Sequence, residues 1–333
     1  MRAIKPASLV AAFVFLFSTC FVFAETAPAK PALPAGITAE WDVQYVPDGD
    51  KAQRLDVFMP EKASEKPLPL LIWIHGGGWR GGSKSGSPAL GFTSDGYVTA
   101  SIEYRFSQKA VFPAQIQDCQ AAIRFLRANA AKYHFDPAHV GVWGSSAGGH
   151  LVALVGTAGG KNAFPKIGGN DEQSDRVQAV CDWFGPADFN TVMAQAADDK
   201  NAKNIFKFNS PSDPYSLLIG VPLNSDTAKG DAVSPVHFVS KDNPPFLIMH
   251  GTHDTLVPFA QSEELLAALK KESVDALLQP LPGSGHGGGA FNKPAAKRLV
   301  KNFFDKNLKE MDVKVEAVPD AELAVPPPAT KAK

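Results

Sequence analysis

Short apolar runs alternate with segments of helical periodicity over most of the chain. The apolar runs, which are typical of strands covered on both faces, are residues 68–75, 97–104, 140–143, 177–184, 246–250 and 276–281. The segments that predict helices are residues 114–132, 148–155, 259–271 and 291–307. Residues 40–46 and 54–59 flank the turn sequence Pro47-Asp48-Gly49-Asp50 and predict an opening hairpin. Strands and helices in alternation indicate an α/β fold with a mostly parallel central sheet and helices on both faces.

One interval breaks this alternation. Residues 187–243 have weak periodicity and many polar and turn residues. A connection this long inside a compact domain is usually functional or carries small elements of its own. We therefore expect a loop-rich insertion over the C-terminal edge of the sheet, where α/β folds bind ligands.

Both ends of the chain differ from this central domain, residues 38–312. Arg2 and Lys5 precede an apolar run that ends at Ala24, which is typical of a secretory signal peptide over residues 1–24. An uncleaved membrane anchor is the alternative. Residues 25–37 are rich in Pro and Ala and predict a linker, and residues 313–333 predict a disordered tail. The protein is therefore expected to be secreted or periplasmic.

The composition is that of an ordinary globular protein. Of 333 residues, 44% are hydrophobic and 20% are charged, and the formal net charge is −1, so no electrostatic argument favours a nucleic-acid partner. After signal cleavage Cys119 and Cys181 remain, and an oxidising compartment allows a disulfide between them. Two buried free thiols are the alternative. No H-E-x-x-H or clustered Cys/His spacing is present, so no metal site is expected.

The sequence Gly144-Ser145-Ser146-Ala147-Gly148 matches G-x-S-x-G and assigns a nucleophile to Ser146. A serine hydroxyl reacts only when it is exposed and touches a base. A tight turn between a strand and a helix exposes it, and the motif lies between a predicted strand and a predicted helix. The five-residue pattern alone would be weak evidence for a nucleophile, but its position between a predicted strand and a predicted helix makes the assignment specific.

A second glycine-rich sequence, His75-Gly76-Gly77-Gly78-Trp79, follows the apolar run at residues 68–75. Acyl transfer builds negative charge on the carbonyl oxygen, and backbone N–H groups stabilise it. Glycines have no side chain, so their backbone can come close enough to the oxygen to donate a hydrogen bond. We therefore expect an oxyanion hole made by the amides of Gly77, Gly78 and Ala147. A phosphate loop is disfavoured, because neither its Lys-Ser/Thr pair nor G-x-G-x-x-G is present.

The predicted acid and base follow the last two strands. Asp254 comes just after residues 246–250, and His286 lies in the glycine-rich sequence after residues 276–281. The chain order Ser, Asp, His is that of α/β-hydrolases. Asp182 and Asp188 are alternative acids. His250 and His253 are too close to Asp254 in sequence to be its partner. His150 is expected to pack against other side chains or to cap a helix.

Several motifs together resemble those of bacterial α/β-hydrolase esterases, in particular the bifunctional feruloyl and acetyl xylan esterase-like branch. They are His75-Gly76-Gly77-Gly78-Trp79, Tyr104-Arg105, Ser145-Ser146-Ala147-Gly148-Gly149-His150-Leu151, Trp183-Phe184-Gly185-Pro186, His250-Gly251-Thr252-His253-Asp254 and Gly285-His286. The similarity covers about residues 40–304. The related hormone-sensitive-lipase-like esterases usually have Asp before the nucleophile, where this chain has Ser145. The resemblance implies an esterase without a cofactor.

These features predict a serine ester hydrolase with the triad Ser146, Asp254 and His286, acting on short-acyl or feruloyl esters of carbohydrates. Trp79, Arg80, Trp183 and Phe184 flank the motifs and are expected to bind substrate. An amidase of the arylformamidase type and a non-catalytic binding protein on the same scaffold are the alternatives. A small-molecule or carbohydrate ester is the expected partner, with no nucleic acid and no stable membrane association.

Overall fold

The computed structural model describes residues 30–200 and 207–325. The expected signal peptide and residues 25–29 of the expected linker lie outside these residues. Within them the first element begins at Ile37, close to the predicted start of the folded domain.

The core of the fold is one eight-stranded sheet with the order β1-β2-β4-β3-β5-β6-β7-β8. Its strands are β1 (Ile37–Gln44), β2 (Arg54–Pro60), β3 (Leu68–Ile74), β4 (Val98–Ile102), β5 (Phe135–Ser145), β6 (Ala179–Trp183), β7 (Phe246–Gly251) and β8 (Ala276–Leu281). The pairs β1–β2 and β2–β4 are antiparallel, and all other neighbours are parallel. The predicted α/β fold with a mostly parallel sheet is confirmed.

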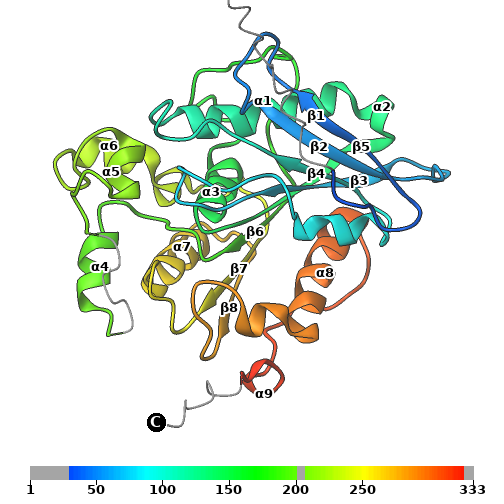
Figure 1. The fold of residues 1–333 in the computed structure, drawn as a ribbon. Helices are drawn as coiled ribbons and strands as arrows, with labels where there is room; N and C mark the ends of the chain where they lie inside the picture. Colours follow the sequence, from blue (N-terminus) through cyan, green and yellow to red (C-terminus); the bar gives the residue numbers. More distant parts are fainter. Residues whose placement is uncertain (1–29, 201–206, 326–333) are drawn as a thin grey trace, which may run out of the picture. The chain divides into compact units, whose positions relative to one another are not determined.

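Helices cover both faces of this sheet (Figure 1). The longer ones are α1 (Ala114–Ala128), α3 (Ala147–Ala158), α7 (Phe259–Lys271) and α8 (Pro294–Lys309), and short helices are α2 (Ala130–Tyr133), η1 (Pro88–Thr93) and η3 (Gly289–Asn292). Alternate residues of a strand point to opposite faces. In β3, Leu70 and Ile72 accordingly join the core with α1, α3 and α7, whereas Leu71 and Trp73 join the core with α8.

The long interval after β6 carries short helices of its own. They are α4 (Val192–Asp198), α5 (Pro214–Ile219), α6 (Thr227–Val233) and η2 (Pro235–Phe238). Asp213 begins α5, because its carboxylate accepts the N–H of Tyr215 at 3.1 Å. Tyr215 and Leu218 pack into the core on the α3 face, so this segment of the insertion is well anchored.

The predicted disordered tail is wrong for residues 313–325. Leu323, in the short helix α9 (Asp320–Leu323), is fully buried, and Val315, Val318 and Val325 pack on the same core as α8. The N–H of Val318 donates to Oε1 of Gln279 on β8 at 2.6 Å. The apolar residues spaced along this Pro- and Ala-rich segment thus pack at the β8 end of the sheet. Residues 326–333 lie outside the described range.

The predicted disulfide between Cys119 and Cys181 is also wrong. Both cysteines are free and buried. Cys119 on α1 belongs to the core on the α3 face, whereas Cys181 on β6 points into the core on the α8 face. The sheet therefore lies between the two sulfur atoms. Burial raises the pKa of both thiols well above the usual value, which disfavours the reactive thiolate.

We therefore expect two free thiols in protein that begins at Glu25, even after aerobic purification. Thiol titration of the denatured, unreduced protein should give two equivalents per chain, and titration of the native protein close to none, because both sulfur atoms are buried. A titre near zero after denaturation would mean that the two cysteines are bonded, contrary to this fold.

Candidate active site

Ser146 occupies a tight turn between β5 and α3. Its backbone has φ 55° and ψ −121°, a conformation that non-glycine residues rarely adopt. Its N–H donates to the carbonyl oxygen of Trp183 at the end of β6, at 2.8 Å. Gly148 allows the turn, because a Cβ there would lie 2.1 Å from the carbonyl oxygen of Ile74. The strand, the turn and the helix together hold the Ser146 side chain above the C-terminal edge of the sheet.

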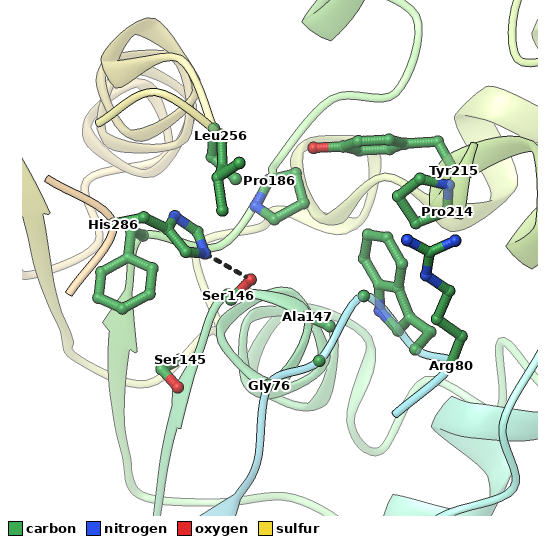
Figure 2. A pocket seen from close by; sticks show the side chains of 15 residues that line it. Gly76, Arg80, Ser145, Ser146, Ala147, Pro186, Pro214, Tyr215, Leu256 and His286 are labelled. Carbon is green, nitrogen blue, oxygen red and sulfur yellow. Dashed lines mark hydrogen bonds between the residues drawn. The ribbon is translucent and has the colours of Figure 1, made fainter. Parts of the chain in front are cut away.

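A chain of two hydrogen bonds connects Ser146, His286 and Asp254. His286 Nε2 lies 2.8 Å from Ser146 Oγ (Figure 2), and His286 Nδ1 lies 2.7 Å from Asp254 Oδ2. An ionised carboxylate can only accept, so the proton sits on Nδ1 and the lone pair of Nε2 faces the serine hydroxyl. Ser146 O–H can then donate to Nε2. The structure therefore brings together the three residues that the sequence predicted as a triad.

Asp254 is held by four donors. Its Oδ1 accepts the N–H groups of Leu256 at 2.8 Å and Val257 at 3.0 Å. Its Oδ2 faces His286 and also His250, whose Nε2 lies 3.2 Å away. Burial alone would raise the pKa of Asp254, but the hydrogen bonds from His250 and His286 outweigh burial and hold it well below the usual range. Asp254 is thus a carboxylate at neutral pH.

The contact with His250 corrects the sequence prediction. His250 was excluded because it lies four residues before Asp254, yet the turn after β7 brings the two side chains together. His250 is fully buried, and its Nδ1 lies 2.7 Å from Ser262 Oγ on α7. It therefore connects the carboxylate to the helix behind it, while His286 remains the histidine that contacts Ser146.

The alternative residues do not contact His286. Asp182 is buried beneath the turn, where its Oδ1 accepts the N–H of Gly185 at 2.9 Å and its Oδ2 has no partner among the described residues. Burial raises the pKa of Asp182 to about 7. Asp188 accepts the N–H of Asn190 at 2.7 Å. His150 packs as expected: its Nδ1 accepts the indole N–H of Trp79, and burial lowers its pKa to about 4.

A cavity of about 410 Å³ opens at Ser146 and His286. Gly77 and Gly78, both with positive φ, form one wall with Ala147. A Cβ at Gly77 would lie 2.1 Å from the carbonyl oxygen of Gly81, so only glycine fits there. Ala147 is the first residue of α3, where an amide has no partner within the helix. The three residues predicted for an oxyanion hole therefore line the same cavity as Ser146.

Three of the four predicted substrate-binding residues line this cavity, namely Trp79, Arg80 and Phe184. Phe184 packs on His286 with 4.5 Å between ring centroids. Trp183 does not line the cavity, so that prediction is wrong. Adjacent residues at a strand end point in opposite directions, and Trp183 packs on Trp143 and Phe291 in the core with α8.

Several further residues that the sequence did not indicate line the cavity, and these are Pro186, Pro214, Tyr215, Leu256 and Val257. Leu256 and Val257 lie two and three residues after Asp254, so closeness in sequence to a predicted site residue, which indicated Trp79, could have indicated them as well. Pro214 and Tyr215 come from the insertion, and no local pattern shows where such a segment packs.

The residues that the structure describes include no group of three or more His, Cys, Asp or Glu side chains that could hold a metal ion. None of the described helices is long and apolar enough to cross a membrane.

The sheet and this site define an α/β-hydrolase, and comparison with known proteins identifies the family. The model of the BD-FAE family matches residues 55–269, more than half of the chain, so the protein belongs to this family of α/β-hydrolase esterases. Esterase LipC of Mycobacterium tuberculosis is 33% identical over 262 residues, which are 75% of this chain and 62% of LipC. Esterase LipQ of the same species is 29% identical, over 77% of this chain and 58% of LipQ. The chain thus spans about three-fifths of the length of these curated relatives.

Comparison with solved structures also finds esterases. A truncated form of a carbohydrate esterase from gut microbiota matches with a TM-score of 0.71 at 32% identity, covering 82% of this chain and 96% of that one. A bifunctional GH43-CE protein of Bacteroides eggerthii matches with a TM-score of 0.72 at 30% identity, covering 81% of this chain and 35% of that one. An acetyl ester-xyloside bifunctional hydrolase of Caldicellulosiruptor lactoaceticus is 26% identical with a TM-score of 0.59, covering 77% and 86%.

The buried carboxyl group of Asp182, which has a partner for Oδ1 alone among the described residues, leads to a prediction about stability. Its pKa is about 7 in the folded protein and about 3.9 in an unfolded chain, so the folded state binds the proton more tightly. The contribution of Asp182 to the stability of the wild-type protein should therefore be lost as the pH rises from about 4 to 7. An Asp182→Asn variant has no such loss, and its advantage in unfolding free energy should grow by up to about 4 kcal/mol between pH 4 and pH 8. Urea unfolding at both pH values measures this difference. An advantage independent of pH would contradict a neutral Asp182.

Proposed function

We propose that the protein is a serine carboxylic ester hydrolase that works through an acyl-enzyme. The observation that carries the proposal is the pair of hydrogen bonds made by His286, to Ser146 Oγ at 2.8 Å and to Asp254 Oδ2 at 2.7 Å. Ser146 Oγ attacks the ester carbonyl carbon while its proton passes to His286 Nε2. Asp254 keeps the imidazole in the required tautomer and stabilises its positive charge.

The collapse of the tetrahedral intermediate completes the first half-reaction. The ester C–O bond breaks, the alcohol leaves with the proton from His286, and the acyl group remains on Ser146. Water then attacks the acyl-enzyme, gives its proton to His286, and releases the acid and the serine. Both intermediates carry an oxyanion, and the amides of Gly77, Gly78 and Ala147 beside Ser146 are suited to stabilise it. No step requires a cofactor.

For the substrate we infer a short acyl group, acetyl above all, on a soluble or carbohydrate alcohol. The helices that the structure describes in the insertion are short, with six residues in α5 and seven in each of α4 and α6, so this described part forms no long apolar cover of the kind that lipases carry. Trp79 and Tyr215 add aromatic surface to the cavity, which suits sugar rings. The carbohydrate esterase and the acetyl ester-xyloside hydrolase among the similar structures support the same substrate class.

Substitution of two neighbouring serines tests the assignment of the nucleophile. Ser146→Ala should lower kcat for p-nitrophenyl acetate by on the order of 10⁶-fold, because removal of one triad member disables the whole unit. Ser145→Ala is the matched control, since Ser145 lies beside the cavity but makes no hydrogen bond to His286. Loss of activity in Ser145→Ala with retention in Ser146→Ala would contradict the assignment.

The preference for short acyl groups is tested with p-nitrophenyl esters of increasing chain length and with acetylated and feruloylated sugars. We expect kcat/KM to be highest for acetyl esters and to fall with longer chains, because the cavity has a volume of only about 410 Å³. No increase in rate is expected when a substrate passes its solubility limit. Faster hydrolysis of long-chain triglyceride emulsions than of p-nitrophenyl acetate would point to a lipase instead.

We also propose export from the cytoplasm. Arg2 and Lys5 followed by an apolar run to Ala24 support signal-peptide cleavage. Protein recovered from a host that secretes it should then begin at Glu25, as measured by the mass of the intact chain. Recovery of the full-length chain in the membrane fraction would favour the uncleaved anchor.

A further inference from the structure

Arg80 has an unusual position at the cavity. Its side chain is half-buried and lies over Gly78, with Nε 3.9 Å from the place that a Cβ of Gly78 would occupy. Nη1 donates to the carbonyl oxygen of Ser212, just before α5, at 2.7 Å. In Figure 2 its guanidinium lies beside Pro214, on the side of the cavity opposite to His286. The hydrogen bond to Ser212 thus holds this cation next to the proposed oxyanion loop.

None of the described carboxylates neutralises Arg80. Asp213 is adjacent to Ser212 in sequence, but its oxygens accept hydrogen bonds from its own loop and from α5, from Asn209 N–H at 3.0 Å and from the Ser216 hydroxyl at 2.6 Å. Arg54 on β2 likewise donates to a neutral oxygen, Oε1 of Gln44, but two other half-buried cations near the sheet are ion-paired. Arg105 meets Asp118 at 2.8 Å, and Lys84 meets Asp56 at 2.7 Å.

The cavity therefore carries one fixed positive charge. Among the residues that line it, Arg80 is the single one with a permanent charge, and no lining residue is an Asp or Glu. A guanidinium presents five N–H donors in a planar fork, and one bond to Ser212 leaves most of them available. Its geometry matches a carboxylate, which can accept two parallel bonds, better than it matches a single hydroxyl.

We propose that Arg80 forms an anion subsite, so that the preferred esters carry a carboxylate a few bonds from the ester group. This inference rests on the proposed esterase function. The carboxylate can belong to the alcohol, as in an acetylated sugar acid, or to the acyl group, as in the half ester of a dicarboxylic acid. In both cases the guanidinium binds the carboxylate while the ester carbonyl lies between Ser146 and the amides of Gly77 and Gly78.

Two matched pairs of esters test the subsite and separate these sources. For the alcohol side the pair is 4-acetoxybenzoate and its methyl ester. For the acyl side it is mono-p-nitrophenyl adipate and p-nitrophenyl methyl adipate, whose chain is too long for the carboxylate to close readily on its own ester. Within each pair only the charge changes appreciably, so the ratio of kcat/KM for the anionic over the neutral ester measures recognition of the carboxylate.

We expect this ratio to fall by about tenfold in Arg80→Gln in at least one pair, because one charge-assisted contact is lost. Arg80→Glu should lower the ratio further, and Arg80→Lys should retain part of it, because lysine keeps the charge but not the fork. The difference between wild type and Arg80→Gln should shrink at high salt. Lys132→Gln is the matched control: it removes one positive charge at an exposed pair with Glu40, away from this cavity, and should leave the ratio unchanged.

The outcomes separate the two claims. If wild-type protein hydrolyses neither member of any pair, nor p-nitrophenyl acetate, the proposed function is wrong and the subsite with it. If it hydrolyses them and Arg80→Gln changes the ratio by less than about threefold in both pairs, the subsite alone is wrong. A loss of equal size for neutral and anionic esters counts against the subsite as well, since it would mean that Arg80 acts only on the shape of the loop.

Discussion

The strained turn at Ser146 is the constraint on which the rest of the site depends. A serine with φ 55° and ψ −121° is unfavourable by itself, and it persists because the surrounding structure holds it. The carbonyl oxygen of Trp183 accepts the Ser146 N–H, and the backbone of β3 packs directly against Gly148. The nucleophile is therefore positioned by three neighbouring strands of the sheet, and its orientation does not depend on a flexible loop.

The parallel sheet explains why the other parts of the site meet at that turn. The carboxyl ends of β3, β5, β7 and β8 lie along one edge, so the proposed oxyanion loop, Ser146, Asp254 and His286 all follow strand ends. Asp254 is further held by Leu256, Val257 and His250, which keep its carboxylate ionised and correctly directed. The insertion completes the cavity by adding Pro214 and Tyr215. The chemistry that we propose follows from this convergence.

Sequence patterns predicted those features that depend on local chemistry or on strand ends. Glycine-rich turns, the order Ser146, Asp254, His286 and the apolar strands all leave a periodic or compositional signal. Features that depend on tertiary packing were missed or mistaken. Trp183 was assigned to the wrong face, because its neighbour Phe184 takes the place at the cavity. The burial of Leu323 and the separation of Cys119 from Cys181 depend on which face of the sheet each segment covers. The contact of His250 with Asp254 depends on the turn after β7.

The most direct test of the central claim is covalent labelling with a fluorophosphonate, followed by peptide mapping. Such a reagent reacts with a serine that is both exposed and activated by a base. We expect one adduct per chain, on Ser146, formed at a rate that falls strongly in His286→Ala although Ser146 is still present. An adduct on Ser145, or a rate that does not depend on His286, would contradict the account of this site.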